Sequence, residues 1–186
     1  ADAFSGTVRS VDLETKEVST LSGFPYEFAV FDGPIDQARF ESPRGCGIAP
    51  EGLLIADSAT LRWIDFNEST VSTLTGRAGD VGDQDGDSSE ARLGYLTHDL
   101  IWSLSGEYAL LSDRSNDRIR LFVKHTQTLY ALGPLNDEDR VLSLNGPGGL
   151  DLTDEGDLLI ADTFNGRVIR VNLSALNLDE QLAQQR

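Results

Sequence analysis

The chain has 186 residues, about the length of one domain, and its 31 acidic and 15 basic side chains give a formal net charge of −16. So acidic a surface repels phosphate, and no basic patch is visible in the sequence, so nucleic acids and anionic membranes are not expected partners. Its one cysteine, Cys46, allows neither an internal disulfide nor a cysteine-based zinc site within the chain.

Aliphatic and β-branched residues alternate with polar residues in short runs separated by Gly, Asn, Asp or Pro, a pattern typical of short antiparallel strands. In chain order, the predicted strands cover residues 7–12, 17–21, 45–50, 52–57, 61–66, 70–75, 98–103, 108–113, 118–123, 127–132, 148–152, 157–161 and 167–172. Beyond them, Ser174 can cap a short helix over residues 175–184, with Leu178 and Leu182 on one face.

Sequence elements recur with a period of about 53 residues, which indicates a repeat architecture. The clearest are Val-Ser-Thr-Leu at 18–21 and 71–74, Asp-Gly at 32–33 and 85–86, and Ile-Ala-Asp at 55–57 and 160–162. Residues 1–8 also align without a gap on residues 161–168, so the chain starts within a repeat. Four-stranded sheets at such a period are typical of propeller blades, each of which buries its faces on its neighbours.

These spaced elements resemble NHL repeats, a β-propeller family, over nearly the whole chain except the last dozen residues. The matching residues are Val71-Ser72-Thr73-Leu74-Thr75-Gly76, Gly82, Asp85-Gly86, Ala91-Arg92-Leu93, Ile160-Ala161-Asp162, Asn165 and Arg167. The resemblance implies an all-β fold, namely an NHL-type propeller of about three to four four-stranded blades. We expect the short C-terminal helix to follow it. We expect an arc cut from, or ordered within, a longer propeller, or one completed by another chain; a compact four-bladed ring is the alternative.

The repeat boundaries divide the expected propeller segment, residues 1–174, into four units. They are a partial blade at 1–23, blades at 24–76 and 77–133, a partial blade at 134–174, and a helix or tail at 175–186. An open arc would expose the faces of its terminal blades, and apolar surface of that size normally binds something.

The resemblance leaves function open, because NHL propellers include protein-binding scaffolds, RNA-binding domains, extracellular modules and a peptide-amidating lyase. We predict a non-catalytic protein–protein interaction or structural scaffold module in an extracellular or surface assembly, with a protein partner or self-assembly through blade faces and long loops. Sequons at Asn67 and Asn172 fit secretion. The alternative is a metal-dependent hydrolase or lyase acting in the propeller channel, although His98 and His125 are few ligands for a zinc lyase.

Four aromatic residues in the first long linker, Phe24, Tyr26, Phe28 and Phe31, are candidate binding residues. Hydrophobic residues in a loop need a partner surface. Intramolecular packing, as an extra strand or a packed loop, is the main expectation, and a binding interface is the alternative.

Asp83, Asp85 and Asp87 in the second linker are weak calcium candidates, since they offer oxygen ligands at alternate positions. The simpler interpretation is a linker turn with solvated carboxylates, and we expect no cofactor. The repeated Ile-Ala-Asp aspartates are expected to bond backbone N–H groups at turns, because a residue that recurs in each unit is structural rather than catalytic. Cys46 is expected to be a small buried side chain.

Overall fold

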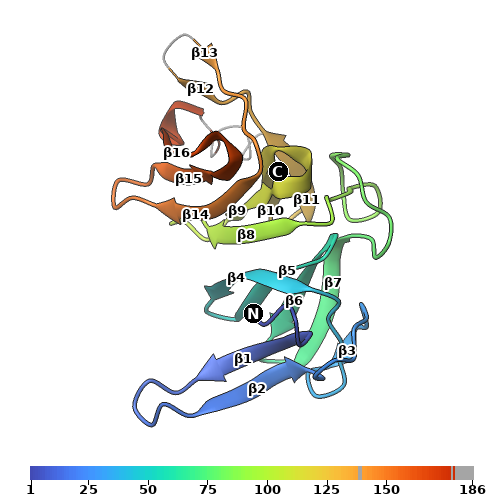
Figure 1. Ribbon diagram of the computed structural model, residues 1–186. Helices are drawn as coiled ribbons and strands as arrows, with labels where there is room; N and C mark the ends of the chain where they lie inside the picture. The colour runs from blue at the N-terminus through green and yellow to red at the C-terminus, as the bar shows by residue number, and fades with distance from the viewer. Residues whose placement is uncertain (138–139, 177, 179–186) are drawn as a thin grey trace.

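The computed structural model describes residues 1–137, 140–176 and 178, which form an all-β chain of antiparallel sheets (Figure 1). The sheets follow one another along an arc, with the N-terminal hairpin at one end and the sheet of residues 147–171 at the other. The prediction of a propeller-type all-β fold is confirmed. The helix predicted over 175–184 lies mostly outside the described residues, and Ser174–Leu176 form only a 3₁₀ turn, η3.

Each of the thirteen predicted strands matches an observed strand whose ends lie within two residues of the predicted ones, and the short strands at 33–34, 136–137 and 140–141 were not predicted. The first sheet is the hairpin β1 (Thr7–Val11) and β2 (Val18–Gly23). The second contains β3 (Gly33–Pro34), β4 (Pro43–Ala49), β5 (Gly52–Asp57), β6 (Thr60–Asp65) and β7 (Thr70–Gly76). Its strand order is β3-β7-β6-β5-β4, so β4 lies at one edge of the sheet and the short β3 at the other.

The third sheet has the order β11-β10-β9-β8 and the last has the order β14-β15-β16. Their strands are β8 (Thr97–Trp102), β9 (Tyr108–Asp113), β10 (Arg118–Val123), β11 (Thr128–Leu132), β14 (Pro147–Leu152), β15 (Leu158–Asp162) and β16 (Arg167–Val171). Short 3₁₀ turns, η1 (Arg114–Asn116) and η2 (Thr163–Asn165), follow β9 and β15. A small ladder, β12 (Asn136–Asp137) with β13 (Arg140–Val141), was not predicted.

Three buried clusters join neighbouring sheets, one cluster between each pair. Successive side chains of a strand point to opposite faces. Accordingly, Ile55 packs toward the N-terminal hairpin with Val8 and Phe40, while its neighbour Leu54 packs toward the third sheet with Phe122. The third cluster likewise joins the third and last sheets. The blades therefore stabilise each other through shared faces, as the repeat pattern predicts.

The edge strands β4, β8 and β14 pass close to one another along the inner side of the arc. A Cβ on Gly45 would lie 2.6 Å from the Cα of Asp99, so only glycine permits this approach of β4 to β8. Asp99 in turn accepts a hydrogen bond from the Leu150 N–H at 3.0 Å, which ties β8 to β14. Cys46 on β4 is exposed, so the expectation of a buried thiol is wrong; the edge strand turns this side chain to solvent.

Candidate functional site

The Ile-Ala-Asp aspartates are structural anchors, as their repetition predicts. Asp57 accepts hydrogen bonds from the N–H groups of Glu41 at 2.9 Å and Ser42 at 2.7 Å, and from Arg62 at 3.0 Å. Arg62 also binds the Asp32 carboxylate at 2.7 Å, and both Arg62 and Asp57 are fully buried. This cluster fastens the linker that precedes β4 to the sheet that follows it.

The third sheet repeats the arrangement with Arg120, which binds Asp113 at 3.2 Å and Asp85 at 2.8 Å. In the last sheet, Ile169 comes two residues after the residue that pairs with the anchoring aspartate, which is the position that Arg62 and Arg120 hold in the other two sheets. The linker before the last sheet lacks Asp-Gly. The second and third sheets thus have both a buried arginine and an Asp-Gly linker, and the last sheet has neither. The reason is that the linker aspartate supplies the second carboxylate for the buried guanidinium.

The three anchoring carboxyls titrate differently. Burial raises the pKa values of Asp57 and Asp113, although hydrogen bonds and the neighbouring guanidinium groups oppose the rise. Burial also acts on Asp162, but hydrogen bonds from Asn165, the Asn145 N–H and Arg167 outweigh it and lower its pKa. Asp162 therefore remains the most easily ionised of the three.

The calcium candidates of the second linker each have a different protein partner. Asp83 pairs with Arg118 at 3.2 Å and Asp85 with the buried Arg120, while Asp87 accepts the Ser89 N–H at 2.8 Å. Within residues 1–137, 140–176 and 178, no three His, Cys, Asp or Glu side chains are grouped so that they could hold a metal ion.

The aromatic linker forms an exposed surface rather than the expected packed loop or extra strand. The exposed fractions are 77% for Tyr26, 51% for Phe28 and 56% for Phe31, and only Phe24 is half-buried. The Arg39 guanidinium carbon lies 3.5 Å from the centre of the Phe24 ring. We call Tyr26, Phe28 and Phe31 the aromatic surface.

Backbone hydrogen bonds hold the aromatic surface in place. The Tyr26 N–H donates to the Ser5 carbonyl at 2.8 Å, and Phe31 exchanges hydrogen bonds with Arg39 at 3.1 and 3.3 Å. Tyr26 has φ of +67°, a left-handed conformation that costs a non-glycine residue roughly 1–2 kcal/mol. Tyr26 takes this conformation in a turn in which the Glu27 N–H donates to the Phe24 carbonyl at 3.1 Å, so the turn fixes the backbone that carries the exposed ring.

Comparison with known proteins points to one family. No family model matches the sequence. The human NHL repeat-containing protein 2 is 29% identical over 154 residues, covering 71% of this chain and 21% of that protein, and the bovine protein gives the same values. Sequence and fold together support the NHL-repeat β-propeller family. The chain spans about a fifth of the length of these NHL relatives.

Solved structures share the propeller-type fold of this chain. An auxiliary nutrient binding protein from Bacteroides thetaiotaomicron has a TM-score of 0.68 at 17% identity, covering 92% of this chain and 44% of that one. One from Bacteroides ovatus has a TM-score of 0.65 at 15% identity, with coverages of 90% and 43%. A Nidogen/Laminin complex gives 0.53 at 10% identity, with coverages of 90% and 59%.

The sequence did not reveal a group of basic side chains at the inner edge of these sheets. Arg44 in β4 and His98 in β8 each come one residue after the residue that pairs, in the strand register, with an anchoring aspartate, so they hold equivalent positions. Arg114 follows β9. Aligning the three repeats on their aspartates would have placed Arg44 and His98 in register. Arg114 comes from a different strand end, so no local pattern links it to them.

Proposed function

We propose that this chain is a non-catalytic binding or scaffold module that contacts a protein partner through the aromatic surface. The observation that carries the proposal is the exposure of three aromatic rings on a backbone that is fixed by hydrogen bonds. Aromatic residues are enriched at protein interfaces, because a rigid ring buries a large area with little loss of side-chain entropy. A fixed loop also reduces the entropy that must be lost on binding.

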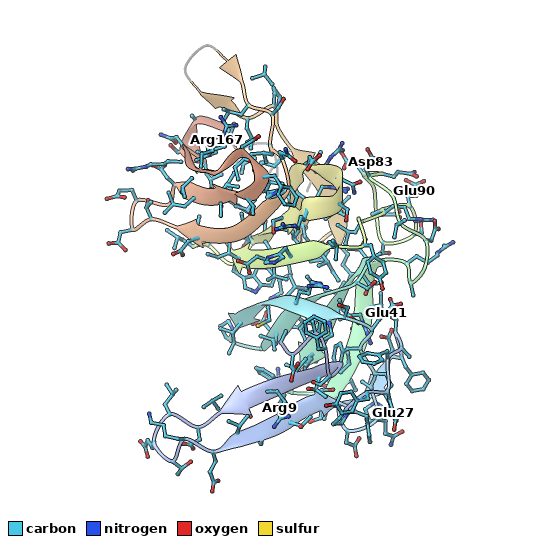
Figure 2. All side chains as sticks on the ribbon, in the orientation of Figure 1. Arg9, Glu27, Glu41, Asp83, Glu90 and Arg167 are labelled. Carbon is cyan, nitrogen blue, oxygen red and sulfur yellow. The ribbon has the colours of Figure 1, made fainter. Side chains whose placement is uncertain are left out.

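Acidic side chains on one side of the molecule indicate the charge that we expect on the partner surface. Both long linkers lie on the same side of the arc, and the labelled acids Glu27, Glu41, Asp83 and Glu90 are all found on that side (Figure 2). Glu27 is part of the aromatic linker itself, although it pairs with Arg39 at 2.8 Å. A partner surface with an apolar centre and basic residues at its rim fits this combination.

The names of the structural neighbours agree with a binding role in general terms. Two neighbours are described as auxiliary nutrient binding proteins and a third forms part of a Nidogen/Laminin complex. We carry over to this chain only the general role of binding. For the described residues, no helix is both long and apolar enough to span a membrane.

We further infer an extracellular or cell-surface location. Both sequon asparagines, Asn67 and Asn172, are exposed and therefore accessible to modification. Glycosidase treatment of the protein from the cells that make it should lower its mass. An unchanged mass, with both asparagines unmodified, contradicts this support for secretion.

Site-specific photo-crosslinking tests the interface. A benzophenone amino acid at Tyr26 should give a discrete crosslinked product with one partner in the cells that make the protein. The same group at Leu13, an apolar residue that is 78% exposed on the hairpin turn, is the matched control and should give none. Identical products from both positions, or a product only from Leu13, would contradict the assignment. Sedimentation velocity of the pure protein distinguishes self-assembly from binding of another protein.

A further inference from the structure

An open cavity of about 410 Å³ lies between the third sheet and the linker that leads to the last sheet. Its walls are the corner between β9 and β10 at residues 116–118, the chain at 131–134 where β11 ends, and linker residues 142–144. This volume lies within the range of about 300–1,000 Å³ that is typical of sites for small ligands. The cavity occurs where the repeat departs from its pattern, since this linker lacks Asp-Gly.

Part of the lining is apolar. Leu132 and Leu144 are buried and belong to the core cluster between the third and last sheets, and the half-buried Leu142 packs against that cluster. Displacing water from such side chains is favourable. This part of the cavity therefore suits the hydrocarbon part of a ligand.

Two polar side chains of the lining are held by hydrogen bonds and each keeps one oxygen uncommitted. Nδ2 of Asn116 donates to the Gly82 carbonyl at 2.7 Å and to the Asp113 carboxylate at 2.9 Å, and Oδ1 of Asp117 accepts the Gly146 N–H at 2.7 Å. Within the part of the chain that the structure describes, no group donates to Oδ1 of Asn116 or to Oδ2 of Asp117. Both oxygens can therefore accept from a ligand.

The charge of Asp117 is also unmatched. Arg118 lines the same cavity, but its guanidinium binds Asp83 at 3.2 Å and the Asn116 carbonyl at 3.2 Å. None of the described cationic side chains forms an ion pair with Asp117. A net negative charge therefore remains at the cavity.

Comparison of the repeats singles out Asp117. It comes four residues after the anchoring aspartate of its repeat, where the N-terminal and last repeats have Gly6 and Gly166. All three residues are left-handed, with φ of +53° for Asp117, +68° for Gly6 and +63° for Gly166. Glycine adopts this conformation more readily than a residue with a side chain. The third repeat thus places a carboxylate at the cavity where glycine is the easier choice for the backbone.

We propose that this cavity binds a small organic cation, a protonated amine attached to an apolar body. The apolar body lies on Leu132, Leu142 and Leu144, and the ammonium contacts the Asp117 carboxylate. An ammonium has N–H donors and no acceptor, which fits the uncommitted oxygens of Asn116 and Asp117. The net charge of −16 also attracts cations to the chain. This inference is independent of the aromatic surface.

The test titrates isotope-labelled protein with hexylammonium chloride at neutral pH and follows backbone amide signals by NMR. At an ionic strength of about 0.15 M, charges farther apart than about 8 Å are largely screened. The Gly146 N–H donates to Asp117 and should show a saturable shift, whereas Gly106, in the turn at the other end of β9, should not respond. Hexanoate has the same chain with the opposite charge, and methylammonium has the same charge without the apolar body. Both should bind roughly tenfold or more weakly than hexylammonium.

Variants then assign the site. Asp117→Asn can still accept the Gly146 N–H but removes the charge, so it should weaken hexylammonium binding roughly tenfold or more. The matched control is Asp36→Asn, which removes an exposed carboxylate of the first linker and should leave binding unchanged. The proposal is overturned if Gly146 shows no saturable shift, if either other probe binds as tightly as hexylammonium, or if a folded Asp117→Asn variant keeps the wild-type affinity. If Asp117→Asn fails to fold, the comparison of the three probes on the wild type still decides.

Discussion

Arg62→Met removes the guanidinium at the centre of the buried cluster of the second sheet while keeping a side chain of similar length. The guanidinium donates to the carboxylates of Asp57 and Asp32 at 3.0 and 2.7 Å. It also donates to the carbonyls of Phe31 and Arg39, each at 3.1 Å. Among the described residues, Arg62 is the one counter-ion of the fully buried Asp57, and the substitution removes it.

The expected loss follows from the burial of that carboxylate. Removing one partner of a buried ion pair costs about 3–5 kcal/mol, because the remaining charge cannot be solvated. In a chain of this length, that loss corresponds to a decrease in Tm of roughly 6–20 °C. The matched control is Arg170→Met, whose guanidinium also contacts two carboxylates but is 59% exposed. Exposed pairs of this kind contribute about 1 kcal/mol or less.

Thermal and urea unfolding, followed by circular dichroism and tryptophan fluorescence, measure the loss. Trp63 and Trp102 report on the contact between the second and third sheets, where their rings meet edge to face at 6.4 Å. Adding Asp57→Asn to Arg62→Met should recover part of the stability. The amide still accepts from the backbone N–H groups of the linker but carries no buried charge.

Two results would refute this reasoning. The first is an equal loss of stability in Arg62→Met and Arg170→Met, which would mean that burial does not decide the contribution of an arginine. The second is a double variant, Arg62→Met with Asp57→Asn, that is less stable than Arg62→Met alone. That outcome would mean that the orphaned charge of Asp57 is not the source of the loss.

Three further predictions concern titration and metal binding. The pKa of Asp162 is lowered, so its contribution to stability is present above pH 3.8 and is lost as the pH falls through its folded-state pKa. Asp162→Asn should therefore make stability depend less on pH in the acid range, measured by unfolding followed by circular dichroism. The pKa of His98 is also lowered, so stability should decline as the pH falls below 6.5, and His98→Gln should reduce this decline in Tm measurements. Calcium should not raise the Tm, because Asp83, Asp85 and Asp87 each have another partner, and a saturable rise would contradict this.

The strands were predictable because their signal is local. Residues 52–57 and 118–123 were predicted as strands and are strands with the same bounds in the structure. Alternating polarity and flanking turn residues act within a few positions, so the sequence carries them directly. The structural role of Asp57 and Asp162 was predictable for a similar reason, since their recurrence in each unit is visible without coordinates.

Contacts between segments were not predictable in the same way. Arg118, the first residue of β10, binds Asp83, while Arg120, two residues later, binds the anchoring Asp113. Arg118 and Arg120 share a face of β10, and the position of the second linker decides which of them is buried. The cluster of Arg44, His98 and Arg114 was missed because its members come from three different strand ends.

The buried cluster of the second sheet also holds the aromatic surface in place. Arg62 donates to the Phe31 carbonyl, and Asp32, the next residue, accepts from both Arg62 and the Thr73 N–H. The linker that carries the exposed rings is therefore anchored from beneath by a buried cation. Loosening this anchor should disorder Phe31 before the sheet itself unfolds, since the linker depends on these hydrogen bonds while the sheet also has its own ladder and core. A milder variant, Asp32→Asn, should therefore reduce crosslinking from a benzophenone at Phe31 with only a small change in Tm, and unchanged crosslinking would separate the anchor from the interface.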